Sequence, residues 1–251
     1  MREFALKDDL ALITGGATGI GLGIARALIQ AGARVVLSSR NEAMLRQATE
    51  QLGQQAAYRI HDVTDFEHCE SFVEQIEAET GPVSILVNNA GIHLKKPSEE
   101  VRTEEFREVL DVHVLGAHEL TVAVGKRMMP RGRGSIVFIA SMASLFGIPN
   151  VVAYSAAKAG YLGMVRALAT EWGGRGIRVN AIAPGWIESD MMRRAINDDP
   201  QRQQKILART PLGVYGTPED IGWAAAFLCS DAAKFITGVC LPVDGGAAIG
   251  F

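Results

Sequence analysis

Cysteine is scarce in this sequence, which also has no long hydrophobic run and no large excess of one charge. Its three cysteines are odd in number and lack C-x-x-C spacing, so we expect buried thiols in a reducing compartment. The net charge of −3 argues against a nucleic-acid-binding surface. No apolar run could span a bilayer, and no apolar signal-peptide core follows the first four residues. These absences predict a cytoplasmic protein that binds neither nucleic acid nor membrane.

What the sequence has is an alternation of short apolar runs and amphipathic stretches. With 251 residues, 48% of them hydrophobic, the chain suits one α/β domain with a full core. Expected strands are 10–14, 34–38, 56–60, 85–88, 135–140, 178–182 and 239–243. Expected helices are 19–31, 42–52, 65–80, 103–129, 151–172 and 218–230. Strands this apolar, alternating with helices, predict a doubly wound parallel sheet of about seven strands with helices on both faces. Ligands of such sheets bind at the carboxyl ends of the strands.

Residues 186–212 interrupt this alternation. The stretch is polar and carries Arg193, Arg194, Asp198 and Asp199. Because it lies between the sixth strand and the last helix, we expect a substrate lid there, within a single domain of residues 1–251.

A glycine-rich turn follows the first strand and leads into a helix. Glycines permit a tight turn and let backbone N–H groups approach a pyrophosphate at a helix N-terminus. The G-x-x-x-G-x-G spacing differs from the usual G-x-G-x-x-G dinucleotide fingerprint, and the alternative is a turn that binds nothing. Its position and the residues downstream favour cofactor contacts by Gly15, Thr18, Gly19, Ile20 and Gly21.

The end of the second strand indicates which cofactor this turn would bind. About 20 residues beyond the glycines, NAD enzymes carry an acid that binds the ribose 2′-hydroxyl. Here that position is Ser39, followed by Arg40. A missing carboxylate beside a guanidinium favours a 2′-phosphate and hence NADP(H), with NAD(H) still possible. The alternative is that Arg40 is a solvated surface residue.

Asp62 and Val63 end the third strand and are also candidate cofactor contacts. A carboxylate at this point can accept a hydrogen bond from an adenine amino group. The alternative is that Asp62 or Thr64 caps the helix that follows.

Tyr154 and Lys158 point most directly to chemistry, because residues four apart on a helix share a face. An ammonium beside a phenol favours the phenolate, so we expect Lys158 to pull the pKa of Tyr154 down from about 10. Ser141, thirteen residues upstream, can hold a carbonyl or alcohol oxygen beside that phenol, and its spacing suits this better than that of Ser144. Tyr-x-x-x-Lys alone arises by chance on helices; with the glycine turn, it predicts proton transfer at a C–O group.

Over essentially its full length the sequence resembles the short-chain dehydrogenase/reductase family. Six pieces stand in that family's order and spacing: Thr14–Gly21, Asn88–Gly91, Ser141, Tyr154-x-x-x-Lys158, Arg178–Gly185 and Val243–Gly246. The resemblance implies a Rossmann-type sheet, a nicotinamide cofactor and a tyrosine acid/base. Tyr154 would give its proton to a carbonyl during reduction and take it back during oxidation. Lys158 would also bind the ribose hydroxyls, and Ser141 would orient the substrate oxygen.

The resemblance also assigns cofactor contacts beside the adenosine ribose and around the nicotinamide. The first set is Asn89, Ala90 and Gly91. In the second set, Pro184 and Gly185 would frame the ring, while Ile187 and Ser189 would bind its carboxamide.

His113 is a departure from the family pattern. The family often carries an asparagine at this position, which holds a water that relays protons to the lysine. A neutral imidazole can donate and accept, so His113 is a candidate catalytic residue in the same relay. The alternative is a core histidine satisfied by the backbone. We expect no metal site, because His118 lies off the face of His113 and no other ligand cluster is evident.

Family members are usually tetramers or dimers, so the resemblance implies a homotetramer or homodimer. Pairing would use the two long helices, 103–129 and 151–172. Small residues on the second helix suit close approach: Ala153, Ala156, Ala157, Gly160 and Gly163. The alternative is that they pack within one subunit.

Two substrate classes are candidates. The sequence is similar to sugar-acid and polyol dehydrogenases such as gluconate 5-dehydrogenases, and also to 3-oxoacyl-acyl-carrier-protein reductases. Three arginines, Arg193, Arg194 and Arg209, could hold a carboxylate, with His93, Lys95 and Lys96 at the same rim. Alternatively the arginines form surface ion pairs, and Leu145, Trp186, Met191 and Met192 form an apolar groove for an acyl chain. A non-catalytic nucleotide-binding relative is the remaining alternative, and the intact Ser141, Tyr154 and Lys158 argue against it.

Overall fold

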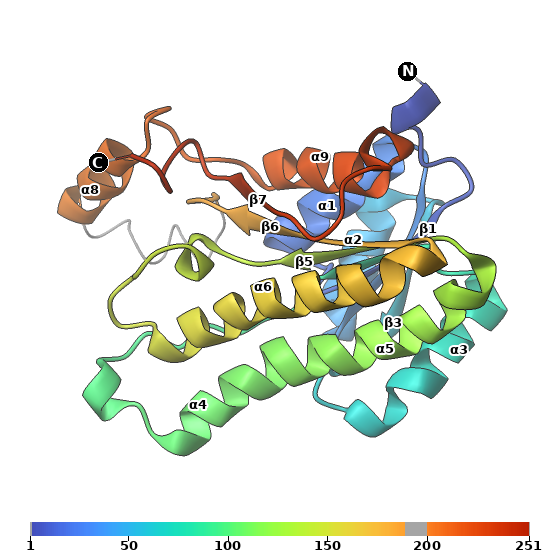
Figure 1. The fold of residues 1–251 in the computed structure, drawn as a ribbon, viewed down its shortest axis with the longest axis horizontal. Helices are drawn as coiled ribbons and strands as arrows, with labels where there is room; N and C mark the ends of the chain where they lie inside the picture. Colours follow the sequence, from blue (N-terminus) through green and yellow to red (C-terminus); the bar gives the residue numbers. More distant parts are fainter. Residues whose placement is uncertain (1, 189–199, 251) are drawn as a thin grey trace.

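The computed structural model describes residues 2–188 and 200–250. Within these ranges, seven strands form one parallel sheet in the order β3-β2-β1-β4-β5-β6-β7 (Figure 1). The strands are β1 (Leu10–Thr14), β2 (Arg34–Ser39), β3 (Ala56–Ile60), β4 (Ile85–Asn88), β5 (Gly134–Ile139), β6 (Ile177–Pro184) and β7 (Cys240–Val243). The predicted fold class is confirmed, and no strand end is displaced from its predicted position by more than two residues.

Helices cover both faces of this sheet. They are α1 (Gly19–Gln30), α2 (Glu42–Leu52), α3 (Cys69–Thr80), α4 (Thr103–Leu110), α5 (Gly116–Met128), α6 (Val152–Trp172), α8 (Pro200–Arg209) and α9 (Pro218–Cys229). In Figure 1, α1 and α9 lie above the sheet, and α5 and α6 lie below it. None of the helices in the described ranges is long and apolar enough to cross a membrane.

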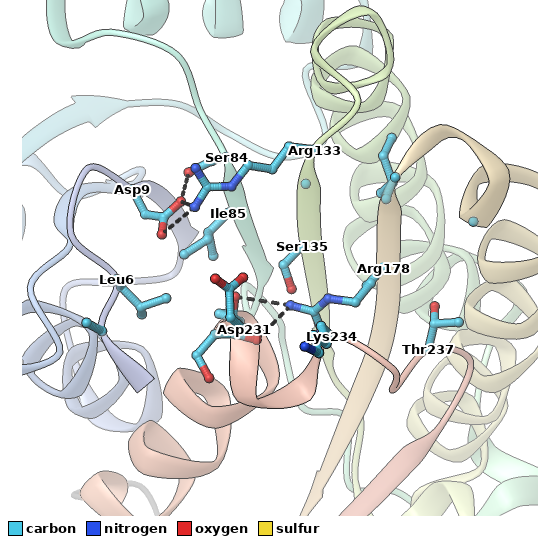
Figure 2. Close-up of a pocket in the computed structure, with 17 residues that line it drawn as sticks. Leu6, Asp9, Ser84, Ile85, Arg133, Ser135, Arg178, Asp231, Lys234 and Thr237 are labelled. Atoms are coloured by element: carbon cyan, nitrogen blue, oxygen red, sulfur yellow. Dashed lines mark hydrogen bonds and ion pairs between the residues drawn. The ribbon is translucent and has the colours of Figure 1, made fainter. Parts of the chain in front are cut away.

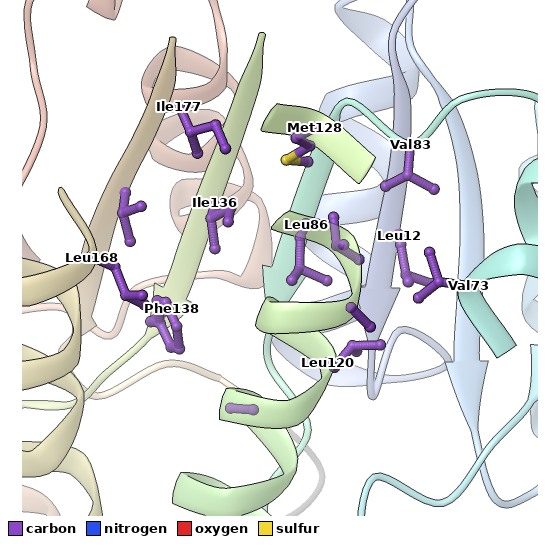
Figure 3. Close-up of a cluster of buried hydrophobic side chains, with 14 of the residues drawn as sticks. Leu12, Val73, Val83, Leu86, Leu120, Met128, Ile136, Phe138, Leu168 and Ile177 are labelled. Atoms are coloured by element: carbon purple, nitrogen blue, oxygen red, sulfur yellow. The ribbon is translucent and has the colours of Figure 1, made fainter. Parts of the chain in front are cut away.

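Each face of the sheet has its own apolar core, because successive side chains of a strand point to opposite faces. Leu12 of β1 belongs to the core under α3, α5 and α6, together with Leu120 of α5 (Figure 3). Ile13, the next residue, belongs to the core under α1, α2 and α9, together with Ile24 of α1. A strand buried on both faces must be apolar throughout, as the sequence of β1 is.

The strand order reverses beside β1, which pairs with β2 on one side and with β4 on the other. Connections that leave the two sides of such a switch point pass to opposite faces of the sheet, so a crevice forms at the carboxyl ends of the strands. The glycine turn follows β1 and Asn89–Gly91 follows β4, so both reach this crevice.

The helical stretch after residue 103 differs from the single helix predicted over 103–129. A π-helical turn, Asp111–Leu115, separates α4 from α5. Such turns occur mostly as one-turn bulges in α-helices, often at functional sites, and apolar periodicity does not reveal them. This π turn contains His113. The sequence patterns also failed to predict α8, which lies inside the expected lid segment.

The amino ends of the strands carry a polar cavity of about 320 Å³, and three of its charged groups, Asp9, Arg133 and Arg178, make contacts within the fold (Figure 2). Asp9 accepts a hydrogen bond of 2.7 Å from Ser84 and pairs with Arg133 at 2.9 Å, which ties the starts of β1, β4 and β5 together. Arg178 donates to three carbonyl oxygens at the end of α9, those of residues 228–230. These contacts stabilise the sheet at the edge opposite the crevice.

Candidate active site

The glycine turn after β1 is built for close approach of the backbone. Gly15 has a φ of +62°, which favours glycine, and its N–H donates to the carbonyl of Ser38 at 2.7 Å. A Cβ on Gly21 would collide with the carbonyl oxygen of Gly15, so α1 begins directly against the turn. Thr18 is the N-cap of α1 and makes no side-chain capping bond. Gly19 and Ile20 form the first turn of α1, whose N–H groups are suited to an anion.

Asn89 braces the turn from the end of β4. Its Nδ2 donates to the carbonyl oxygens of Thr14 at 2.9 Å and Gly15 at 3.0 Å. The backbone N–H groups of Asn89 and Ala90 both donate to Thr14 Oγ1 at 3.0 Å. The side-chain amide of Asn89 therefore holds the ends of β1 and β4 together.

A cavity of about 160 Å³ lies at the ends of β1, β2 and β3. Seven predicted cofactor residues line it: Gly15, Ser39, Arg40, Asp62, Val63, Ala90 and Gly91. The sequence analysis missed the other four lining residues, Ser38, His61, Ile92 and Val112. His61 stacks on Phe72 with ring centroids 4.1 Å apart, and its position directly before Asp62 is the one signal that could have identified it.

Polar groups in this cavity suit a phosphorylated ribose. Ser39 Oγ is buried and has no hydrogen-bond partner among the described residues. The Arg40 guanidinium is largely exposed and lies 3.7 Å from Asp62 Oδ2. A buried hydroxyl without a partner and an exposed guanidinium on the lining of the same cavity fit an anionic ligand group.

The two carboxylate oxygens of Asp62 have different partners. Oδ1 accepts hydrogen bonds from the N–H of Thr64 at 3.0 Å and from its hydroxyl at 2.8 Å. Burial raises the pKa of Asp62, but the Thr64 hydrogen bonds and the Arg40 charge outweigh it, so the pKa is lowered. The capping alternative is wrong, because the N-cap residues of the 3-10 helix Phe66–His68 and of α3 are Asp65 and His68. Asp62 Oδ1 instead closes a turn with Thr64, and Oδ2 remains beside Arg40.

The predicted catalytic side chains meet where β5 ends and α6 begins. Ser141 follows β5 as the N-cap of a short 3-10 turn, and its Oγ accepts from the N–H of Ala143 at 3.1 Å. Ser141 also hydrogen-bonds the Tyr154 side chain. Lys158, one turn after Tyr154 on α6, is buried, and its Nζ donates to the carbonyl of Ile139 at 2.6 Å.

The ionisation of Tyr154 differs from the prediction. Burial raises the pKa of Tyr154 above its usual value, and the Ser141 hydrogen bond only partly opposes this. Lys158 Nζ lies 5.6 Å from the centre of the Tyr154 ring and is already bonded to a backbone carbonyl. Burial also lowers the pKa of Lys158 to about 7, so its charge is itself disfavoured. In this structure Tyr154 is therefore a neutral phenol, the form that can donate a proton.

His113 lies directly behind Tyr154. The side chain is buried, and its ring stands edge-on to the Tyr154 ring at 5.5 Å. Nε2 lies 2.8 Å from the carbonyl oxygen and 3.1 Å from the nitrogen of Ile92, whereas Nδ1 has no partner among the described residues. Burial, helped by the Lys158 charge, lowers the pKa of His113 to about 3, so the ring is neutral. A Cβ on Gly91 would collide with this ring, so glycine is required there.

The predicted nicotinamide end is formed by the residues that follow β6. Pro184 ends the strand, and the N–H of Gly185 donates to the carbonyl of Val243 at 2.9 Å. Ile187 is buried and bridges to Gly216. Ser189 lies outside the described residues.

Several residues expected to line the substrate rim have other partners. The Arg209 guanidinium lies 4.1 Å from the centre of the Phe146 ring, and Lys96 contacts both carboxylate oxygens of Glu105 at 3.1 Å. Lys96 is thus engaged in an ion pair with Glu105, whereas Arg209 has no carboxylate partner among the interactions of the described residues. Trp186 lines a separate cavity with Tyr215. Met191, Met192, Arg193, Arg194 and their proposed acidic partners lie outside the described residues.

The arrangement fits a nicotinamide dinucleotide and a proton donor. The uncapped start of α1 suits the pyrophosphate, the Ser39 cavity suits the adenosine half, and Tyr154, near the start of α6, lies with Ser141, which follows β5. In the part of the chain that the structure describes, no three His, Cys, Asp or Glu side chains are grouped to hold a metal ion.

Comparisons with known proteins agree with this geometry. A family model described as Enoyl-(Acyl carrier protein) reductase matches residues 15–248. Gluconate 5-dehydrogenase of Gluconobacter oxydans (strain 621H) is 37% identical over 249 residues, 98% of this chain and 97% of the relative. The 3-oxoacyl-[acyl-carrier-protein] reductase FabG of Escherichia coli (strain K12) is 40% identical over 240 residues, 96% of this chain and 97% of the relative.

A solved structure is similar over the same extent. The crystal structure of a gluconate 5-dehydrogenase from Burkholderia cenocepacia J2315 in complex with NADP and tartrate has a TM-score of 0.94 at 33% identity. The match covers 100% of this chain and 99% of that chain. Agreement over nearly the whole chain, in sequence and in fold, makes this protein a member of the short-chain dehydrogenase/reductase family, an NAD(P)-dependent oxidoreductase that interconverts alcohols and carbonyls.

Proposed function

We propose that the substrate is a small polyhydroxylated molecule: a sugar, a polyol or a sugar acid. The observation that carries the reaction is the hydrogen-bonded pair of Ser141 and Tyr154, with Lys158 one helical turn away. Similarity to a gluconate 5-dehydrogenase, in sequence and in fold, supports the sugar-acid class.

Three side chains take part in the proton transfer, each with its own role. Ser141 holds the substrate oxygen beside the Tyr154 hydroxyl. Tyr154, neutral because it is buried, donates its proton to a carbonyl oxygen in reduction and accepts it in oxidation. Lys158 binds ribose hydroxyls and, when charged, favours the phenolate that remains after transfer. The bound nicotinamide supplies or accepts the hydride.

His113 is proposed to extend this proton path. Its Nε2 is already used by Ile92, so only Nδ1 is available to a water. The shorter contact, to the Ile92 carbonyl, favours the tautomer with the proton on Nε2, which leaves a lone pair on Nδ1. A water donating to that lone pair could exchange protons with Lys158, as the family's asparagine is held to do.

NADP(H) is the proposed cofactor, with NAD(H) bound more weakly. The supporting observations are the buried, unpartnered Ser39 hydroxyl and the exposed Arg40 at the edge of its cavity. The remaining proposed cofactor contacts are those given by the family resemblance, Pro184, Gly185, Ile187 and Ser189 among them.

The proposed setting is a cytoplasmic homotetramer or homodimer with a lid at about 186–212. Free cysteines support a reducing compartment, since Cys69 and Cys229 are buried thiols. The small residues of α6 are partly buried within the subunit and partly exposed. Ala153 and Ala157 are buried against Val109 of α4, whereas Ala156 and Gly163 are exposed and would meet a partner subunit.

A second candidate is a ketoreductase that acts on a 3-oxoacyl thioester. It is favoured by 40% identity to an acyl-carrier-protein reductase, slightly above the identity to the gluconate enzyme. Substrate turnover distinguishes the two candidates.

The test is a turnover panel with NADPH and NADP+ that compares sugar acids, polyols and a 3-oxoacyl thioester. We expect sugar acids or polyols to have the higher kcat/KM, and a tenfold preference for the thioester would overturn the substrate assignment. Tyr154→Phe should lower kcat by about a hundred- to ten-thousand-fold and leave cofactor affinity unchanged. The matched control is Tyr58→Phe on β3, which should have no effect.

A further inference from the structure

His93 lies beside the catalytic tyrosine without being part of the Ser141–Tyr154–Lys158 set. Its ring centre is 5.0 Å from that of Tyr154, with the two planes inclined at 48°. His93 is exposed, whereas His113, whose ring lies 5.5 Å from that of Tyr154, is buried. The two imidazoles therefore differ in access: His113 faces the protein interior, and His93 can meet a substrate.

The backbone on the amino-terminal side of His93 is fixed by the site itself. Ile92, the preceding residue, has both its N–H and its carbonyl oxygen in contact with His113 Nε2, at 3.1 and 2.8 Å. His113 belongs to the π turn and its ring contacts that of Tyr154, so the π turn positions both His93 and the catalytic tyrosine.

The backbone on the carboxyl-terminal side is fixed by Lys96. Its N–H donates to the carbonyl of Asn150 at 2.8 Å, in the segment that leads into α6. Its ammonium contacts both oxygens of Glu105 on α4, which also accepts from the N–H of Arg102 at 2.9 Å. These hydrogen bonds lower the pKa of Glu105 to about 2, so the carboxylate remains charged. Residues 92–96 are thus held at both ends, with His93 between the two anchors.

A side chain held this way is suited to selecting a substrate, because little of its binding energy is lost in ordering it. The oxygen that receives the proton must lie within hydrogen-bond reach of the Tyr154 hydroxyl. A polar group on a neighbouring carbon would then come within reach of an imidazole whose ring contacts Tyr154. An aliphatic acyl chain offers no such group next to the carbonyl except its thioester.

We propose that His93 is a specificity-determining residue, which binds a hydroxyl or carboxylate on a carbon near the reacting C–O group. This deepens the proposed function and rests on it. The substrate class is therefore a hydroxyl- or carboxyl-bearing carbonyl compound, distinguished from a plain ketone by the His93 contact.

The experiment compares two substrates in His93→Phe, which keeps a ring against Tyr154 but removes both nitrogens. One substrate is the best sugar acid or polyol of the wild-type panel, and the other is a plain cyclic ketone with no second polar group. For the polar substrate we expect kcat/KM to fall about tenfold or more, mainly through KM, because a hydrogen bond is lost. Turnover of the plain ketone and affinity for NADPH should change less than threefold.

Two further variants complete the test. His93→Gln keeps a hydrogen-bonding group and should restore most of the lost kcat/KM. His118→Phe, at an exposed histidine of α5, is the matched control and should behave as the wild type.

The outcomes separate this inference from the function on which it rests. If the wild type turns over polar substrates and His93→Phe does so equally well, the role of His93 is overturned and the proposed function stands. Equal losses on both substrates would also overturn it, because they would mean that the ring only supports Tyr154. A wild type that turns over no sugar acid or polyol overturns both.

Discussion

At the scale of single residues, His113 is the position where this chain departs most from its family. An asparagine amide carries a separate donor and acceptor, so it could bond the carbonyl and the N–H of Ile92 at once. The imidazole presents one nitrogen, Nε2, to both groups, and in any one tautomer it can serve only one of them well. The core interpretation explains Nε2 and the relay interpretation explains Nδ1, so the two are compatible.

His113→Asn should preserve or raise activity, whereas His113→Ala should lower it and alter the pH–rate profile. An unchanged profile in the alanine variant would limit His113 to a packing role. His118→Asn, at an exposed position, is the control.

The same substitution should change acid stability. The folded pKa of His113 is about 3, lowered chiefly by burial from 6.5. Below pH 6.5 the His113 imidazole binds a proton in the unfolded chain, whereas in the folded protein it stays neutral down to about pH 3. The free energy of unfolding therefore decreases as the pH falls from 6.5 to 3. The urea midpoint of His113→Asn should therefore fall less between pH 6.5 and 4 than that of the wild type. An equal fall would mean that the imidazole is solvated.

We expect the charge of Arg40 to determine the preference for NADP(H) over NAD(H). Arg40→Ala should weaken NADP(H) binding about tenfold or more and barely affect NAD(H), since only the 2′-phosphate needs the guanidinium. Fluorescence titration with both reduced cofactors measures this. Arg46→Ala, which removes an exposed arginine of α2 paired with Glu42, should change neither affinity. Equal affinity of the wild type for the two cofactors would contradict the assignment.

At the scale of elements, α9 illustrates how the amino edge of the sheet contributes stability without taking part in catalysis. The last carbonyl oxygens of a helix lack partners within it. Arg178, near the start of β6, donates to three carbonyl oxygens at this end. The arginine thus fixes the end of α9 against the sheet.

Arg178→Met should lower the free energy of unfolding by about 2–3 kcal/mol, because hydrogen bonds from a charged group are lost. Turnover per folded molecule should be unchanged, since Tyr154 lies at the opposite edge of the sheet. Urea unfolding measures the first and active-site-normalised kcat the second. Arg175→Met, an exposed arginine nearby, is the control. A matching loss of kcat would show that the two edges are coupled.

At the scale of the whole molecule, apolar side chains are exposed on α6 and on the π turn between α4 and α5. Val152 is 40% exposed and Leu115 is 45% exposed, and Gly163 has space for a side chain. A surface of small and apolar residues along two helices suits a second copy of the chain.

Gly163→Arg should weaken assembly without unfolding the subunit. No described atom lies within 4 Å of a Cβ built there, and replacing glycine within a helix favours the helix itself. Light scattering after size-exclusion chromatography should show a smaller species than the wild type, with the same circular dichroism. Gly174→Arg, also facing open space, should leave assembly intact. A wild type that is monomeric at micromolar concentration would rule out the oligomer.

The sequence by itself determined the sheet, the glycine turn and the family. Strand and helix positions follow from local periodicity, and the order and spacing of the six motifs indicate the family. Only the tertiary structure decided the interactions between distant segments. The sequence predicts Lys158 beside Tyr154 and a lowered pKa of Tyr154. The fold buries both side chains, and the Lys158 ammonium donates to the carbonyl of Ile139, so the pKa of Tyr154 is raised instead. The π turn, the pairing of Lys96 with Glu105 and the contact of His93 with Tyr154 were also invisible in the sequence, because each depends on which remote segment lies opposite.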